Sequence, residues 1–167
     1  MPVELIRRDE FAIITLNRPE ALNALSFQIV KDIGAALSEV AESDARALLF
    51  IGAGDRAFCA GADISELAGR SLSEAKRGAE AGQRTFARLD TFPIPSVAII
   101  NGYAFGGGME LASACTFRIA TPNAKMGLPE IKLGLIPGYG GTQRLPRLIG
   151  EGRALELIMT GRTVEAE

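Results

Sequence analysis

The chain has 167 residues, 47% of them hydrophobic, and a net charge of −2 at pH 7. This size is sufficient for one domain with a buried core. The near-balanced charge, with arginines scattered along the chain, provides no basic face for nucleic acid or an anionic membrane, and no apolar run is as long as a membrane span.

Histidine is absent and there are only two cysteines, Cys59 and Cys115. Without histidine, Ser-His-Asp and Cys-His nucleophile systems and most zinc or non-haem iron sites are excluded, so we expect no metal site. Two cysteines cannot form a disulfide framework, and the N-terminus lacks the pattern of a signal peptide, which predicts a cytoplasmic protein. Proton chemistry near neutral pH would require carboxylates with raised pKa values.

The chain begins with a predicted β-hairpin. Residues 3–8 and 11–17 are alternating runs rich in β-branched residues, with the turn at Asp9 and Glu10. Pro19 then interrupts the regular structure.

Four helical regions are predicted along the rest of the chain. The first starts after Ser26, which suits an N-cap, and its apolar stripe consists of Val30, Ile33, Leu37 and Val40. The polar, alanine-rich stretch 71–90 is the second. A third opens at the glycines of 106–114, and the fourth consists of two helical pieces within 141–160.

Short apolar strands alternate with these helices, at residues 46–52, 97–101, 117–120 and 124–127. The order strand, glycine-rich loop, helix recurs at 46–90 and at 96–115. This recurrence indicates an α/β fold of repeated β-β-α units with their glycine-bearing turns at the same end. No linker divides residues 1–167, so we expect one domain.

Three glycine-rich loops suit the exposure of backbone N–H groups: "AFCAGADI" (57–64), "AFGGGMEL" (104–111) and "LIPGYGGTQRL" (135–145). Phosphate binding is disfavoured, because none of the loops has the G-x-G-x-x-G spacing and no P-loop is present. The other use of paired backbone donors is an oxyanion hole, which would polarise a thioester carbonyl toward an enolate.

Two carboxylates, those of Glu110 and Glu130, combine apolar neighbours with an adjoining glycine loop. Such surroundings favour raised pKa values and a role in proton transfer.

Each of these features also has a purely structural interpretation. Glu110 would suit the first turn of a helix by its charge, and Glu130 would suit an exposed strand end beside Lys132. The other structural interpretations are close helix–strand packing at Gly106 to Gly108, small core residues at Cys59 and Cys115, and a helix cap at Asp63.

Four motifs together resemble the crotonase superfamily, the enoyl-CoA hydratase/isomerase group. They are "NRPEALNAL", "AFCAGADISEL", "INGYAFGGGMELA" and "GLPEIKLGLIPGYGGTQRLPRLIG", and the match runs from about residue 11 to the end of the chain. The resemblance implies a crotonase-like spiral of β-β-α turns over residues 1–167. It also implies that the C-terminal helical region, which builds trimers in the family, is absent from this chain.

The resemblance further implies the site. The backbone N–H groups of Ala62 and Gly107 would form the oxyanion hole. Glu110 would activate water, Glu130 would deliver a proton, and the N–H of Gly138 would help to position the water. The residues implied to contact the CoA thioester are Ala60, Ala62, Asp63, Ile64, Ser65 and Gly107.

The implied activity is that of a lyase of fatty-acid β-oxidation, which hydrates trans-2-enoyl-CoA to 3-hydroxyacyl-CoA. No cofactor is implied, since coenzyme A belongs to the substrate; the expected partners are the acyl-CoA and, in a full-length chain, further copies in a homotrimer or dimer of trimers. Neither nucleic acid nor a membrane is expected as a partner. The alternatives are isomerisation or another reaction of the same family, and a non-catalytic acyl-CoA-binding fragment.

Overall fold

The computed structural model describes residues 1–166 and contains two β-sheets. The strands of the first sheet, in spatial order, are β1 (Val3–Arg8), β2 (Phe11–Leu16), β3 (Ala47–Gly52), β5 (Ser96–Ile100) and β7 (Phe117–Ala120). Those of the second sheet are β4 (Ala57–Cys59), β6 (Tyr103–Phe105), β8 (Lys125–Gly127) and β9 (Val164–Glu165). Each sheet is parallel except for one antiparallel strand at an edge, β1 in the first and β9 in the second.

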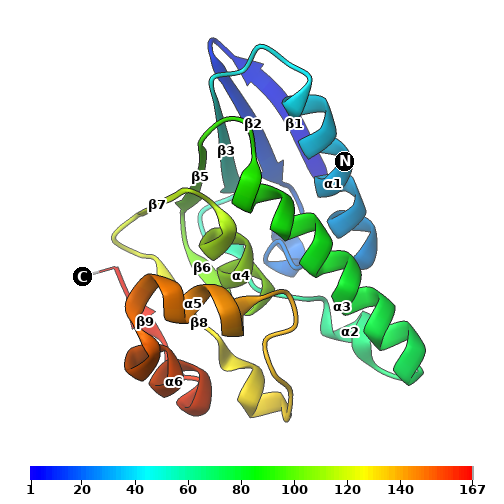
Figure 1. Ribbon diagram of the computed structural model, residues 1–167, viewed down its shortest axis with the longest axis vertical. Helices are drawn as coiled ribbons and strands as arrows, with labels where there is room; N and C mark the ends of the chain where they lie inside the picture. The colour runs from blue at the N-terminus through cyan, green and yellow to red at the C-terminus, as the bar shows by residue number, and fades with distance from the viewer. Residues whose placement is uncertain (167) are drawn as a thin grey trace.

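Helices follow these strands in a regular succession. The α-helices are α1 (Phe27–Ala41), α2 (Ile64–Leu67), α3 (Leu72–Ala87), α4 (Gly107–Ala114), α5 (Gly141–Ile149) and α6 (Glu151–Thr160). Short 3-10 helices are η1 (Pro19–Ala21), η2 (Arg88–Thr91) and η3 (Pro129–Leu133). Three times the chain passes from the first sheet to the second and then into a helix, which confirms the predicted spiral of β-β-α units (Figure 1).

The N-terminal elements form as their sequence predicts. Strands β1 and β2 pair antiparallel, and Asp9 takes the left-handed conformation in the turn between them, at φ 53°. The Ser26 side chain caps α1 by accepting a hydrogen bond from the backbone N–H of Ile29. All members of the predicted apolar stripe of α1 are buried.

Strands β4 and β6 were not predicted, because they lie inside segments that the sequence presents as glycine-rich loops. Each has only three residues, too few for a periodic pattern. They exist because the spiral places them side by side, where the parallel ladder satisfies their backbone groups. The sequence predicted β8 of the second sheet, but its pairing with β4 and β6 is a product of tertiary structure.

Helix α4 lies in the interior, and every one of its residues is buried. It contacts β4, β5 and β6. Close approach depends on Gly108, where a Cβ would overlap the carbonyl oxygen of Cys59 on β4. Cys59 and Cys115 are buried core residues, as their structural interpretation predicted.

Helices α1 and α3 pack side by side over one flank of the molecule (Figure 1). Gly78 and Gly82 lack side chains on the packed face of α3, which lets the rings of Phe27 and Tyr139 lie directly against the helix; a Cβ at either glycine would overlap the ring. This close packing holds Tyr139, which precedes α5, against the middle of α3. Over residues 1–166, no helix has the length and apolarity needed to cross a membrane.

A glycine pair tests the packing of α4. We expect Gly108→Ala to destabilise the protein by about 3 kcal/mol, because the new methyl group overlaps backbone that cannot move freely. Gly152→Ala, in α6 with open space at its Cβ, should instead stabilise by about 0.5 kcal/mol. Urea unfolding of both variants measures the difference; equal midpoints would contradict the proposed contact.

Candidate active site

Glu110 is carried into the interior by α4, and its side chain is only 2% exposed. Its carboxylate does not cap its own helix. Instead, Oε1 accepts hydrogen bonds from the backbone N–H groups of Tyr139 and Gly141, each at 2.7 Å. The interpretation of Glu110 as a simple first-turn residue therefore does not account for its contacts.

The surroundings of Glu110 raise its pKa from 4.5 to about 7. Burial is the largest cause, because it penalises the charged form, and the nearby carboxylate of Glu130 acts in the same direction. The amides of Gly141 and Tyr139 and the Arg144 guanidinium oppose the rise, since they favour the ionised form. The carboxyl can thus exchange a proton near neutral pH.

Glu130 lies in η3 and not at a strand end as its structural interpretation supposed. Its Oε2 is buried and has no hydrogen-bond partner within residues 1–166, and burial raises the pKa of this carboxyl as well. Glycine is required opposite it, since a Cβ at Gly106 would lie 2.9 Å from Glu130 Oε1. Gly106 also has φ 49° and ψ −122°, a backbone conformation that side chains disfavour.

Two backbone N–H groups, those of Ala62 and Gly107, are available next to these carboxyls. Leu25 and Ala62 form an isolated parallel β-bridge, in which the N–H of Leu25 donates to Gly61 O and that of Asp63 donates to Leu25 O. The N–H of Ala62, between these two bonds, therefore points away from Leu25. Gly107 is the first residue of α4, where helices leave their N–H groups unpaired. Within the described chain neither amide has an acceptor.

The two segments that carry these amides lie close together. A Cβ at Gly61 would lie 3.0 Å from Phe105 O and 3.6 Å from Gly107 N. Gly61 avoids this crowding and adopts φ 110°, which favours glycine. The positive end of the α4 dipole reinforces the donors at this point.

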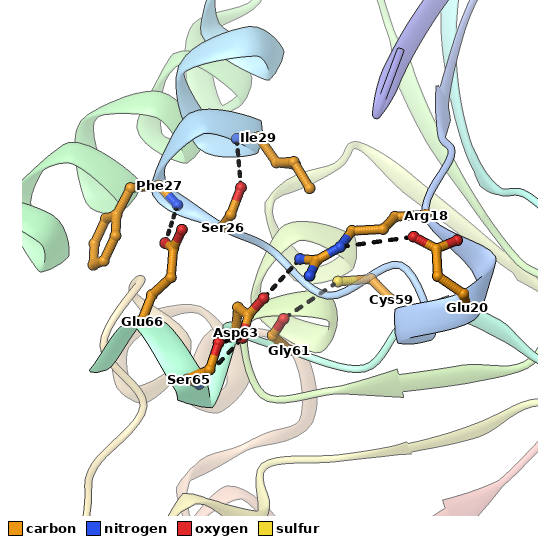
Figure 2. Close-up of polar contacts among 10 residues, drawn as sticks. All are labelled: Arg18, Glu20, Ser26, Phe27, Ile29, Cys59, Gly61, Asp63, Ser65 and Glu66. Atoms are coloured by element: carbon orange, nitrogen blue, oxygen red, sulfur yellow. Dashed lines mark hydrogen bonds and ion pairs between the residues drawn. The ribbon is translucent and has the colours of Figure 1, made fainter. Parts of the chain in front are cut away.

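The loop that carries Ala62 is fixed by the polar contacts drawn in Figure 2. Arg18 Nη1 donates to Asp63 Oδ2 at 2.7 Å. Asp63 is the N-cap of α2, and its Oδ1 accepts from the N–H and the hydroxyl of Ser65. The hydrogen bond from the Ser65 hydroxyl is the largest cause that holds the pKa of Asp63 below its usual value, followed by that from Arg18. Glu66 Oε2 accepts from the backbone N–H of Phe27 at 2.8 Å and so joins α2 to the start of α1.

A cavity of about 1220 Å³ brings most of the predicted site together. The predicted residues that line it are Ala60, Ala62, Ile64, Gly107, Glu110, Glu130 and Gly138. Asp63 and Ser65 are not part of the lining; the Asp63 carboxylate binds the Ser65 hydroxyl and the Arg18 guanidinium. The structural interpretation of Asp63 as a helix cap is confirmed. The remaining walls come mainly from apolar and small residues of α3, η3 and the turn before α5.

Sequence reasoning missed the residues that hold Glu110, namely Tyr139 and Gly141. The motif "PGYGG" was singled out for a free N–H at Gly138, but the two amides on Glu110 come from its neighbours. A Cβ at Gly141 would lie 3.0 Å from Glu110 Oε1, which explains why the last residue of this motif is glycine. For metals, residues 1–166 contain no cluster of three or more cysteine or acidic side chains placed to bind an ion.

The comparisons with known proteins agree with this geometry. The family model for Enoyl-CoA hydratase/isomerase matches residues 7–167. The chain belongs to this family. It is 42% identical to the short-chain-enoyl-CoA hydratase of Clostridium acetobutylicum over 166 residues, and 44% identical to the crotonyl-CoA hydratase of Syntrophomonas wolfei over 164 residues.

Solved structures of the family have the same fold. The enoyl-CoA hydratase from Bacillus anthracis superposes with a TM-score of 0.95 at 42% identity, and that from Thermoplasma volcanium with 0.96 at 36% identity; each match covers 99% of this chain. The chain spans 65% and 66% of those two structures. The alignments with the two hydratase sequences named above include 99% and 98% of this chain, but only 64% and 63% of those sequences.

The raised pKa of Glu110 predicts a pH-dependent stability. Burial favours the protonated form of Glu110 in the folded state. The resulting contribution to the free energy of unfolding is fully present below about pH 4.5 and is lost as the pH rises through about 7. Between pH 5 and pH 8, the free energy of unfolding of the unsubstituted chain should therefore fall by about 2 kcal/mol more than that of Glu110→Gln. Urea unfolding at both pH values measures this, with Glu39→Gln on the exposed side of α1 as the control. Equal losses in the chain and in Glu110→Gln would contradict the prediction.

Proposed function

We propose that this chain carries the active site of an enoyl-CoA hydratase, which adds water to trans-2-enoyl-CoA and forms 3-hydroxyacyl-CoA. The observation that carries the proposal is the meeting, in one cavity, of two carboxyls with raised pKa values and two free backbone N–H groups. The hydratases named above, to which the chain is similar, support the choice of reaction.

In this proposal the N–H groups of Ala62 and Gly107 donate to the thioester carbonyl oxygen. They stabilise the negative charge that develops on this oxygen when a nucleophile attacks C3. The bonds of Gly61, Leu25 and Asp63 fix the Ala62 amide beforehand, so that little reorganisation is needed during the reaction. Ala60 and Ile64 line the same wall and would contact the CoA part of the substrate, and Asp63 and Ser65 would hold that segment in shape.

The two glutamates take opposite parts in the proposed reaction. Water attacks C3 as its proton passes to ionised Glu110, and the electron pair of the double bond moves to C2, which takes a proton from Glu130. Both amides bind Glu110 at Oε1, and no donor among the described residues contacts Oε2, which would accept the proton of the water. The N–H of Gly138, in the cavity wall, would help to hold that water.

Glu110 ionised and Glu130 protonated is a reasonable starting state for two neighbouring carboxyls. Two like charges at close range disfavour double ionisation, so one proton is retained. Only Glu110 receives amide donors from outside its own segment, which favours charge on Glu110, while the unpartnered Oε2 of Glu130 suits the protonated form. No cofactor takes part in this scheme, since coenzyme A arrives with the substrate.

The other expectations about the whole protein stay predictions. They are a single spiral core over residues 1–167, a homotrimer or dimer of trimers, a cytoplasmic location and a place in fatty-acid β-oxidation. Each depends on more than the site geometry.

Hydration of crotonyl-CoA tests the proposal. We expect loss of the conjugated thioester absorbance and a product heavier by one water, and a fall of roughly 100- to 10,000-fold in kcat in both Glu110→Gln and Glu130→Gln, because each removes a proton-transfer group. Glu39→Gln, exposed on α1, should keep full activity.

The alternatives give other results in the same assay. If Glu110→Gln still moved the double bond of a 3-enoyl-CoA while hydration was absent from every form, the site would be that of an isomerase. Binding of acyl-CoA without any turnover by the unsubstituted chain would indicate a non-catalytic acyl-CoA-binding protein. Either result would overturn the hydratase proposal.

A further inference from the structure

We propose that Gln83 and Arg144 are positioning residues, which hold the turn at residues 138–141 so that its amides face Glu110. This inference rests on the proposed function for its meaning in catalysis. The structural basis is that each of three successive peptide groups in this turn has its own anchor.

The first peptide group joins Gly138 to Tyr139. Its N–H, that of Tyr139, donates to Glu110 Oε1 at 2.7 Å, and its carbonyl, that of Gly138, accepts from Gln83 Nε2 at 2.8 Å. Gln83 belongs to α3. The Gln83 side chain therefore fixes the plane of the same peptide that binds the carboxylate.

The second peptide group joins Tyr139 to Gly140, and Arg144 holds it. Arg144 Nη1 donates to Tyr139 O at 3.1 Å, while its Nε and Nη2 donate to the two carboxylate oxygens of Asp90 at 3.2 and 2.8 Å. The Arg144 side chain is only 15% exposed, so this ion pair is partly shielded from water. Glycine is favoured at position 140 by its φ of 107°, and a Cβ there would also displace the Arg144 guanidinium from Tyr139 O.

The third peptide group joins Gly140 to Gly141 and is held by the helix itself. Gly140 O accepts from the N–H groups of Gln143 and Arg144 at 3.0 and 2.9 Å, and Gly141 N donates to Glu110 Oε1 at 2.7 Å. The first turn of α5 thus fixes one of the amides on Glu110 without help. The peptide of the other amide, that of Tyr139, is held by the Gln83 side chain, and the peptide after it is held by the Arg144 side chain.

Both anchors are connected to the segment of α3 and η2. Gln83 lies on α3, and Arg144, itself on α5, donates to Asp90 on η2, which directly follows α3. Gly82, next to Gln83, is the residue that lets the Tyr139 ring pack against α3. The turn that binds Glu110 is therefore tied to the helix that forms a wall of the substrate cavity.

The anchors should influence the charge of Glu110. A well-placed amide donor and the Arg144 guanidinium both lower the pKa of Glu110 against the effect of burial. Other charged or titratable groups around the same cavity are Lys76, Asp90, Glu130, Tyr139 and Arg147. Among the basic side chains of residues 1–166, Arg144 is the one that donates a hydrogen bond to this turn, so its loss also disturbs the geometry of the turn.

Direct titration of Glu110 tests the proposal without reference to turnover. With ¹³C-labelled glutamate carboxyls, the NMR signal of Glu110 is identified by its loss in Glu110→Gln. We expect the pKa of Glu110 to rise by at least about 0.5 unit in Gln83→Met and in Arg144→Gln. Arg144→Lys, which keeps the charge but not the planar fork, should give a smaller rise.

Arg153→Gln serves as the matched control, since Arg153 is exposed on α6 away from the cavity lining. It should leave the Glu110 titration unchanged. An unchanged pKa of Glu110 in both Gln83→Met and Arg144→Gln would overturn the proposal, whatever happened to their thermal stability. If Arg144→Gln failed to fold, Gln83→Met, an exposed substitution on α3, would decide alone.

Kinetics separates this proposal from the proposed function. If both hold, the acid limb of the kcat profile for crotonyl-CoA hydration moves to higher pH in Gln83→Met, with a fall of roughly 10-fold in kcat and little change in KM. If the unsubstituted chain shows no hydration but the pKa shifts occur, the positioning role stands and the proposed function fails. An unmoved acid limb in an active Gln83→Met would count against the positioning role.

Discussion

The burial of one carboxylate, that of Glu110, is the constraint on which the site depends. A carboxyl that is 2% exposed would be strongly destabilising as a charge without compensation. Two backbone amides from a turn thirty residues further along the chain supply that compensation, at 2.7 Å each. The balance between burial and these donors leaves the pKa of Glu110 at about 7, where either protonation state is accessible.

This arrangement requires backbone to approach backbone and carboxylate more closely than most residues allow. Gly108 brings α4 against β4, Gly106 leaves room for Glu130, and Gly141 leaves room for Glu110. At Gly108 a methyl group would overlap the backbone of β4, and at Gly106 and Gly141 it would crowd the two side-chain carboxyls. The glycine-rich loops are thus explained by crowding around two carboxyls as well as by free N–H groups.

The two glutamates share a cavity but differ in their partners. Glu110 accepts from amides outside its own helix, whereas Glu130 has a buried oxygen without a partner in the described chain. Burial raises the pKa of both carboxyls, and the amides of Gly141 and Tyr139 oppose this rise at Glu110. The same residue type thus occupies two different environments in one cavity, in a protein without histidine.

The sequence by itself determined the local elements and the family. The β1–β2 hairpin, the Ser26 cap and the α4 start at the glycines follow from patterns within a few residues, and four motifs in order were enough to identify the resemblance. Only the tertiary structure decided the second sheet, the location of Glu130 in a 3-10 helix and the capture of Glu110 by Tyr139 and Gly141. Those features join residues that are far apart in the chain, through backbone groups that every residue type possesses, and side-chain patterns cannot reveal such pairings.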